Sequence, residues 1–199
     1  MMRILVVEDE KLLCDGIAED LELEKYTVER CYDGAEAYDL LLKEDFPSWL
    51  YQVKKGATTI WEHWDGMKDD GSMWSADMNS FNHYAYGAIG EWMYRAMAGI
   101  EADPEHPGFK HAILYPRIGG NLKYTAGKYH SIYGDVGVKW EVQGKQITLT
   151  VQIPVNTTAE IRLDKAKAVL ESDGLTFTRE ADYMAAEAGS GTYHIAFEQ

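Results

Sequence analysis

The sequence predicts a mixed α and β protein, with a β-α-β-α unit first, a helical middle and an antiparallel β-sandwich last. Three patterns predict this order. Residues 3–7 form an apolar, β-branched run that precedes apolar residues at helical spacing. Residues 84–97 carry a broad apolar stripe at the spacing of a helix. Residues 138–153 alternate apolar and polar side chains, which is typical of strands with one buried face.

The front of the chain predicts two parallel strands, each followed by a helix. The strand at 3–7 leads into an acidic cluster at 8–10, at the end of the strand where open α/β sheets place ligands. Residues 12–21 have helical spacing, residues 26–31 form a second strand, and a second helix begins at Ala35.

This run, with Val-Val-Glu-Asp-Glu and Tyr-Asp-Gly-Ala-Glu-Ala, resembles the start of a response-regulator receiver domain. The resemblance implies that Glu8 and Asp9 help to hold the Mg²⁺ used for phosphoryl transfer. The alternative for the acidic cluster alone is a solvated helix start, where carboxylates suit the helix dipole. The resemblance ends near Phe46, before the strand that carries a receiver's phosphoacceptor aspartate. We therefore expect a truncated receiver fragment that is not phosphorylated on aspartate.

The middle of the chain predicts short helices and loops. Ser48 is a candidate N-cap for a helix that ends near Val53. Thr58 or Thr59 is a candidate cap for the helix or turn that carries residues 61–64.

A longer helix is expected from His83 onwards, with most of its apolar stripe in the core and Gly99 as the C′ residue. Residues 65–73 are rich in Gly and Asp and predict a loop. This loop lacks the residue order of a calcium-binding EF-hand, so we expect no metal site there.

The residues that suggest chemistry lie in two aromatic stretches. Glu62 lies between Trp61 and Trp64, and His83 follows later in the chain among further aromatic residues. Indole faces suit the apolar side of a pyranose, a carboxylate accepts a proton from water, and an imidazole binds a hydroxyl. The alternatives are two tryptophans that pack in the core, a solvated glutamate, and a histidine that caps the helix.

Residues 47–57, 58–66 and 79–92 closely resemble the bacterial α-L-rhamnosidases that have an (α/α)6 catalytic barrel. The resemblance implies that Glu62, in the Trp-Glu-x-Trp motif, is the general base of an inverting hydrolysis. It also implies that His83, in the Phe-Asn-His-Tyr motif, lines the rhamnose site. The implied partner is a rhamnose-containing glycoside, and no cofactor is implied.

In this family the general acid comes from an earlier part of the barrel, which has no counterpart in the sequence. Because an inverting hydrolysis needs both carboxyl groups, we expect the chain alone to be inactive or nearly so. Barrel helices without their neighbours would expose apolar surface, so we also expect self-association through these helices.

The last part of the chain predicts short strands at residues 138–142, 147–153, 159–163 and 193–197, with a hairpin turn at 143–145. Many short strands at close spacing favour an antiparallel sandwich. The stretch Ile-Pro-Val-Asn-Thr-Thr-Ala resembles the C-terminal β-sandwich of the rhamnosidases.

Three segments are therefore expected: a receiver-like fragment at 1–36, the end of a rhamnosidase barrel at 37–107, and a β-sandwich at 108–199. Residues 104–108 are the expected linker between the last two. The expected function is that of a rhamnosidase fragment. Two alternatives stay open, a degenerate phosphorelay protein and a non-catalytic β-sandwich module.

The composition excludes some partners. Asp and Glu outnumber Lys and Arg by 33 to 19, which gives a net charge of −14. Binding to nucleic acid or to an anionic membrane needs a basic face, so we expect neither partner. Cys14 and Cys31 are too few for a disulfide framework, which favours buried free thiols. Without a visible secretory signal or membrane-spanning run, a soluble cytoplasmic protein is expected.

Overall fold

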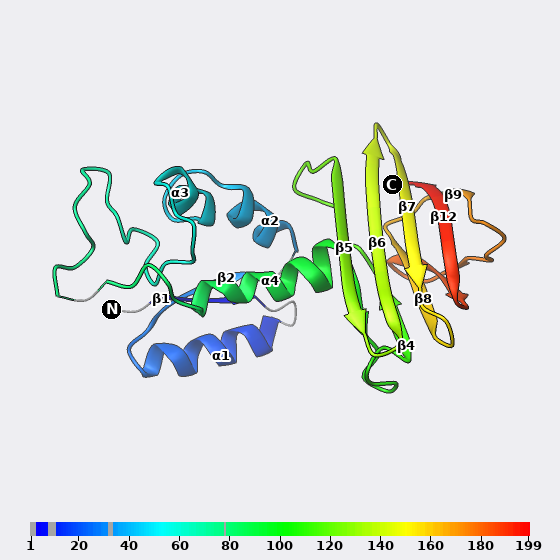
Figure 1. Ribbon diagram of the computed structural model, residues 1–199, viewed down its shortest axis with the longest axis horizontal. Coiled ribbons are helices and arrows are strands. Elements are labelled where there is room, and N and C mark those ends of the chain that lie inside the picture. Colours follow the sequence, from blue (N-terminus) through cyan, green and yellow to red (C-terminus); the bar gives the residue numbers. More distant parts are fainter. Residues whose placement is uncertain (1–2, 8–10, 32–33, 78) are drawn as a thin grey trace. The chain divides into compact units, whose positions relative to one another are not determined.

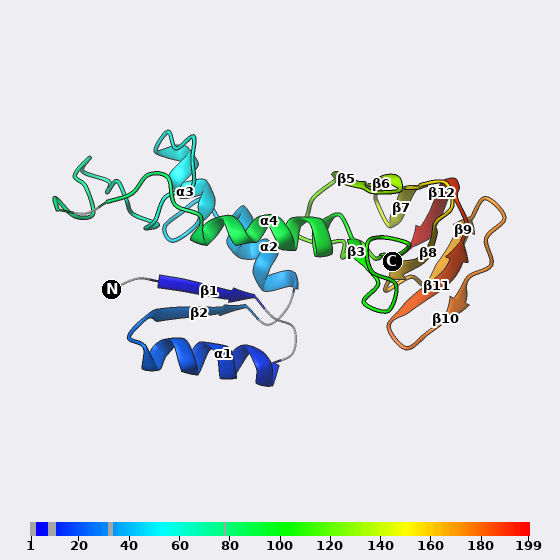
Figure 2. The same cartoon turned by 60° about the horizontal axis from the view of Figure 1, so that its bottom comes forward.

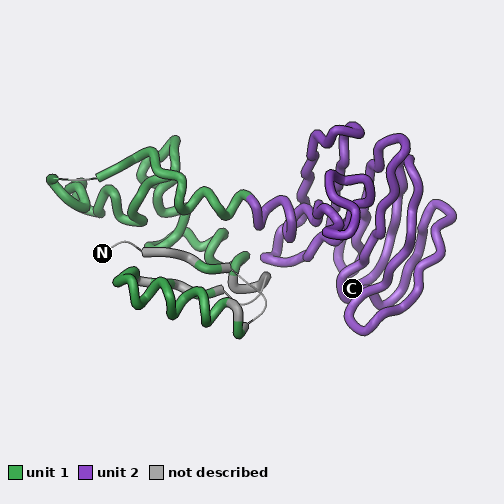
Figure 3. Tube along the Cα trace, turned by 90° about the horizontal axis from the view of Figure 1, so that it is seen from below, with its two compact units in different colours: residues 1–90 green, residues 91–199 purple. Residues whose placement is uncertain are grey.

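The computed structural model describes residues 3–7, 11–31, 34–77 and 79–199 (Figure 1). The chain divides into two compact units, residues 1–90 and residues 91–199 (Figure 3). Each unit is described by itself below.

Unit 1 begins with the predicted β-α-β-α order, in which β1 (Arg3–Val7) pairs in parallel with β2 (Thr27–Cys31). The helix α1 (Lys11–Leu23) lies on one side of this pair and α2 (Gly34–Leu42) on the other (Figure 2). A parallel pair requires a crossover connection, and α1 provides it. The predicted acidic pair, Glu8 and Asp9, lies outside the described residues.

The predicted burial of Cys14 is confirmed. Its side chain is 0% exposed, and its Sγ lies 4.0 Å from the carbonyl oxygen of Val6. The Cys31 side chain lies outside what the structure describes.

The short helix α3 (Trp49–Lys54) has the predicted cap, because the Ser48 hydroxyl accepts a hydrogen bond from the Tyr51 N–H at 3.0 Å. In the described residues 56–77, bends and turns follow and no helix forms. The Thr59 hydroxyl donates to the Phe81 carbonyl across the loop. The predicted loop at 65–73 is confirmed, and an isolated bridge joins Met67 to Met73.

The predicted helix after His83 is divided into three forms: a 3₁₀ turn η1 (Ala85–Ala88), an α turn α4 (Ile89–Trp92) and a π turn η2 (Met93–Met97). The prediction that most of its stripe lies in the core is wrong, since α4 and η2 contain no buried residue. At its start Tyr84 is 87% exposed while Tyr86 is 4% exposed. A 3₁₀ turn has about 3 residues per turn and not 3.6, so it presents a different face to the core.

Unit 2 contains two five-stranded sheets, with strand orders β10-β11-β8-β4-β3 and β5-β6-β7-β12-β9. All pairs in these sheets are antiparallel except β4 with β8. The antiparallel-rich architecture matches the predicted sandwich. The strands are β3 (Ile100–Ala102), β4 (His111–Leu114), β5 (Tyr124–Ser131), β6 (Gly134–Gln143), β7 (Gln146–Ile153), β8 (Thr158–Asp164), β9 (Ala168–Glu171), β10 (Thr178–Arg179), β11 (Tyr183–Ala188) and β12 (Gly191–Glu198).

The core of unit 2 lies between these sheets. The predicted alternation along β7 is confirmed, since Ile147, Leu149, Val151 and Ile153 are all buried. Trp140 is 0% exposed, and its indole N–H donates to the Met97 carbonyl at 2.9 Å. Buried apolar side chains of this kind stabilise a domain by about 1.5–3 kcal/mol each.

The expected linker, residues 104–108, connects β3 and β4, which are paired neighbours in one sheet. No helix in the described part of the chain is long and apolar enough to span a bilayer.

Candidate active site

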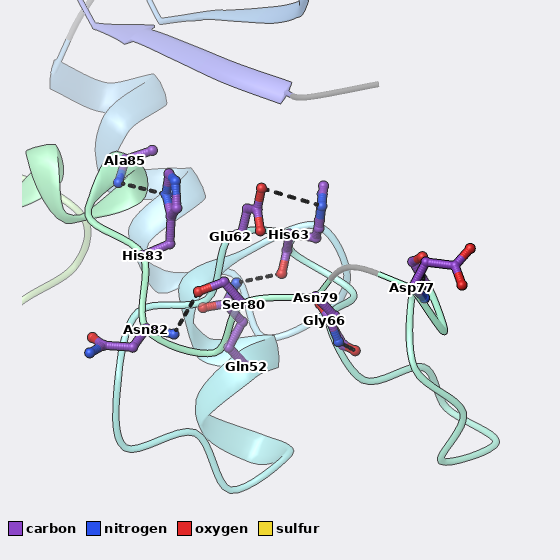
Figure 4. Close-up of polar contacts among 11 residues, drawn as sticks. Gln52, Glu62, His63, Gly66, Asp77, Asn79, Ser80, Asn82, His83 and Ala85 are labelled. Atoms are coloured by element: carbon purple, nitrogen blue, oxygen red, sulfur yellow. Dashed lines mark hydrogen bonds and ion pairs between the residues drawn. The ribbon is translucent and has the colours of Figure 1, made fainter.

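Two backbone hydrogen bonds bring the aromatic stretches of unit 1 together. The Glu62 N–H donates to the Ser80 carbonyl at 2.9 Å, and the His83 N–H donates to the Ile60 carbonyl at 2.8 Å. The two segments run alongside each other, and the side chains of Glu62, His63 and His83 point to the same side of them (Figure 4). The structure therefore brings the predicted Glu62 and His83 into one region.

The Glu62 carboxylate is buried but not saturated with hydrogen bonds. The residue is 7% exposed, and among the described residues its Oε2 has no hydrogen-bond partner. An ionised carboxylate only accepts hydrogen bonds, and a buried one without a donor is costly. Oε2 is thus positioned to accept a hydrogen bond from a bound water or hydroxyl.

His63 is the nearest titratable neighbour of this carboxylate. Its Nε2 lies 4.0 Å from Glu62 Oε1, and its ring stacks on Trp74 with 3.7 Å between ring centroids. Burial lowers the pKa of His63, and the Glu62 carboxylate offsets part of this effect. His63 is therefore neutral at pH 7, and the contact with Glu62 is not an ion pair.

The two tryptophans that flank Glu62 lie in the core. Trp64 is 2% exposed, stacks on Tyr86 at 3.8 Å and meets Trp49 edge-on at 4.9 Å. Trp61 is 4% exposed and meets Phe81 at 4.9 Å. These contacts correspond to the core-packing alternative, in which the indoles support the loop.

His83 lies two residues before η1, whose N-cap residue is Tyr84. The His83 Nδ1 accepts a hydrogen bond from the Ala85 N–H at 3.3 Å. Because Nδ1 accepts, the proton of a neutral imidazole lies on Nε2. Nε2 remains a donor for a ligand, so this local hydrogen bond and ligand binding are compatible.

Gln52 was not identified from the sequence, although its side chain bonds the residues on both sides of Glu62. It is 2% exposed on α3, its Nε2 donates to the His63 carbonyl at 3.1 Å, and its Oε1 accepts from the Trp61 N–H at 3.5 Å. The available signal was its position three residues after Trp49, on the same helical face, where a glutamine is unusual.

Asn79 supports the same loop from the other segment. Its Nδ2 donates to the Gly66 carbonyl at 2.7 Å. In the described residues, no three His, Cys, Asp or Glu side chains are grouped closely enough to hold a metal ion.

Comparison with known families places these residues in context. The bacterial alpha-L-rhamnosidase 6 hairpin glycosidase domain matches residues 30–97, and the bacterial alpha-L-rhamnosidase C-terminal domain matches residues 99–177. The matched regions together include Gln52, Glu62 and His83.

Individual relatives agree. An alpha-L-rhamnosidase of Streptomyces avermitilis is 42% identical over 162 residues, which are 80% of this chain and 15% of that protein. One of Formosa agariphila is 41% identical over 143 residues, which are 71% of this chain and 15% of that protein. The chain thus spans 15% of the length of these two relatives.

Solved structures show the same likeness. The S. avermitilis alpha-L-rhamnosidase complexed with L-rhamnose aligns with a TM-score of 0.73 and 39% identity, over 80% of this chain and 16% of that chain. The enzyme from Dictyoglumus thermophilum aligns with a TM-score of 0.72 and 27% identity, over 92% of this chain and 20% of that chain. Residues 30–97 and 99–177 are therefore homologous to the C-terminal part of the bacterial α-L-rhamnosidases.

Proposed function

We propose that residues 37–199 form the C-terminal part of an inverting α-L-rhamnosidase, in which Glu62 is the general base and His83 binds the rhamnosyl residue. The observation that carries this proposal is the buried Oε2 of Glu62, which has no hydrogen-bond partner among the described residues, in the same region as His83, whose Nε2 is a donor. The substrate class follows from the homology and from the L-rhamnose in the related S. avermitilis complex.

In this mechanism Glu62 Oε2 accepts a proton from a water that attacks the anomeric carbon, while a second carboxylic acid protonates the leaving oxygen. Inverting enzymes hold the two carboxyl groups about 6.5–9.5 Å apart, which leaves room for the water. The neutral His63 next to Glu62 adds no positive charge that would make the base weaker. We assign Trp61 and Trp64 to supporting the loop, because neither has an open face for a sugar.

The test is a titration of the 199-residue chain with L-rhamnose, followed by tryptophan fluorescence. We expect saturable binding that Glu62→Gln weakens about 3- to 10-fold, as for loss of a hydrogen bond to a charged group. L-Mannitol, an open-chain polyol, is the ligand control. A fluorescence change that is the same with both ligands, or unaltered in Glu62→Gln, would contradict the proposal.

The chain alone should not turn over p-nitrophenyl α-L-rhamnoside, because our proposal gives it the base and no general acid. General acid catalysis is worth about 10²–10⁴-fold, so its absence leaves little rate to measure. Turnover that Glu62→Gln abolishes would show that a second carboxyl group of this chain acts as the acid.

For residues 1–36 we propose a receiver-derived unit that carries no phosphoryl chemistry. The parallel β1–β2 pair with its crossover helix favours this origin. Incubation with acetyl phosphate and Mg²⁺ should leave the protein unmodified, as judged by intact mass. An acid-labile mass increase of one phosphoryl group would contradict this assignment.

A further inference from the structure

The position of the Glu62 carboxylate depends on its backbone. Its Oε2 has no partner among the described residues, and Oε1 comes no closer to His63 Nε2 than 4.0 Å. Among the described residues, no side-chain hydrogen bond fixes it in place. The backbone of residues 61–63 therefore determines where the carboxylate lies.

The backbone of residues 61–63 is held from two directions. From the neighbouring segment, the Ser80 carbonyl accepts the Glu62 N–H at 2.9 Å. From α3, Gln52 binds the residue before Glu62 through Oε1 and the residue after it through Nε2. The Nε2 bond to the His63 carbonyl is the shorter, at 3.1 Å against 3.5 Å for the Trp61 N–H.

The burial of Gln52 restricts the hydrogen-bond partners of its side-chain amide. At 2% exposure, Gln52 has almost no access to water, so its amide must find both its donor and its acceptor partners inside the protein. Both partners are backbone groups of the residues next to Glu62, the Trp61 N–H and the His63 carbonyl. The Gln52 side chain thus bonds both the residue before Glu62 and the residue after it.

We propose that Gln52 is a positioning residue for Glu62: it holds the Trp61 N–H and the His63 carbonyl, in the residues on either side of the base, and thereby sets the location of the Glu62 carboxylate. The inference rests on the proposed function for the role of Glu62, but the hold of Gln52 on these two groups is testable without any ligand. General base catalysis requires the base within hydrogen-bond reach of its water, so a small displacement of this loop would impair it.

The first measurement is native-state amide hydrogen exchange of the full chain, resolved by NMR. Gln52→Met keeps the length of the side chain and removes both hydrogen bonds. We expect exchange at the Trp61 and Glu62 amides to rise at least tenfold, on the order of the loss of one or two net hydrogen bonds. The matched control is Asn79→Ala, which removes a side-chain bond from the same loop at Gly66 and should change those two amides less than twofold.

Each result of the exchange measurement either supports or overturns the proposed role of Gln52. Unchanged exchange in Gln52→Met, or a wild-type chain whose Trp61 and Glu62 amides are already unprotected, overturns the proposal. If Gln52→Met also unfolds α3, Gln52→Glu takes its place, because it keeps an acceptor oxygen and loses the donor. We then expect faster exchange at the Glu62 amide, and wild-type exchange there overturns the proposal.

The second measurement separates positioning from general stabilisation. L-Rhamnose affinity is measured by fluorescence titration for wild type, Gln52→Met, Glu62→Gln and the double variant. If Gln52 acts through Glu62, Gln52→Met weakens binding about 3- to 10-fold in the wild type and less than twofold in Glu62→Gln. An equal effect in both backgrounds means that Gln52 only supports the fold, and overturns the proposal.

The two measurements distinguish a failure of the proposed function from a failure of the proposed role of Gln52. A wild-type chain that does not bind rhamnose defeats the proposed function, while the exchange measurement still decides whether Gln52 holds residues 61–63. A chain that binds rhamnose but shows additive effects in the cycle keeps the proposed function and defeats the role of Gln52.

Discussion

At the scale of the residue, Asp164 is the buried acid of unit 2. It is 5% exposed, accepts a hydrogen bond from the Tyr115 hydroxyl at 3.5 Å, and contacts Gln199 Nε2 at 3.3 Å. Burial raises the pKa of Asp164, and burial also raises the pKa of Tyr115 to about 12. Folding therefore shifts both groups towards their neutral forms.

This shift predicts a pH dependence of stability. The folded state binds the Asp164 proton more tightly than the unfolded state, whose pKa is about 3.9. The resulting stabilisation is fully present below that value and is lost as pH rises through the raised pKa of the folded state. Between about pH 4 and 7, wild type should therefore lose stability relative to Asp164→Asn in urea unfolding.

The control for this prediction is Glu187→Gln, which removes one negative charge from an exposed position on β11 of the same sheet. It should follow the wild-type pH profile. Parallel profiles for wild type and Asp164→Asn would show that the buried carboxyl does not contribute to the pH dependence.

Among single residues, the sequence indicated Glu62 and His83 as parts of one sugar site but not the backbone contacts that join their segments. The loop pairing that joins them depends on Ser80 and Ile60 carbonyl groups, which every residue type possesses. The burial of Trp64 was left open for a related reason. An indole that stacks on a tyrosine and one that stacks on a sugar have the same sequence signature.

At the scale of the element, Gly99 lies between the end of the helical stretch and the start of β3. Its φ is +73°, and its carbonyl accepts the Tyr115 N–H at 2.8 Å. A Cβ at this position would lie 2.0 Å from the backbone nitrogen of Pro116. Both the backbone conformation and the close approach of the next strand require glycine here.

Gly99→Ala should therefore destabilise unit 2 by about 2–4 kcal/mol, from the left-handed conformation together with the clash. Gly144→Ala is the matched control, because Gly144 has φ +65° but open space around its Cβ. It should cost only about 1–2 kcal/mol, from the conformation alone. Urea unfolding followed by tryptophan fluorescence gives the free energy of unfolding of both variants. Equal losses of stability would show that the steric clash at Gly99 contributes nothing.

Elements were predictable where one local rule determines them. The alternation of β7, the Gly144 turn and the Ser48 cap follow from neighbouring residues in the sequence. The division of residues 85–97 into 3₁₀, α and π turns does not, because side chains with helical spacing are compatible with all three forms. Those forms depend on packing partners that lie far away in the sequence.

At the scale of the whole molecule, the two units differ in how they bury apolar side chains. Unit 2 contains a continuous core between two sheets. The buried cluster of unit 1 has three aromatic members, Trp49, Trp64 and Tyr86, with a few half-buried aliphatic neighbours. The homology explains this difference, since the matching proteins are several times longer than this chain.

Self-association is the prediction that belongs to this scale. Within the segment of unit 1 that matches the 6 hairpin glycosidase domain, Phe46 is 41%, Val53 59% and Tyr84 87% exposed. Apolar groups of this size favour association when no partner covers them. We expect light scattering after size-exclusion chromatography to give a mass above 22.5 kDa that rises with concentration.

The net charge of −14 opposes this association, so the apparent mass should also rise with salt. Replacing Phe46, Val53 and Tyr84 with Lys should restore the monomer. Lysine at Ile132 and Val155, which are 86% and 72% exposed in unit 2, changes the charge in the same direction and provides the control. If this control restores the monomer as well, charge repulsion explains the effect. A wild-type chain that stays monomeric at high concentration and high salt would show that these side chains do not mediate association.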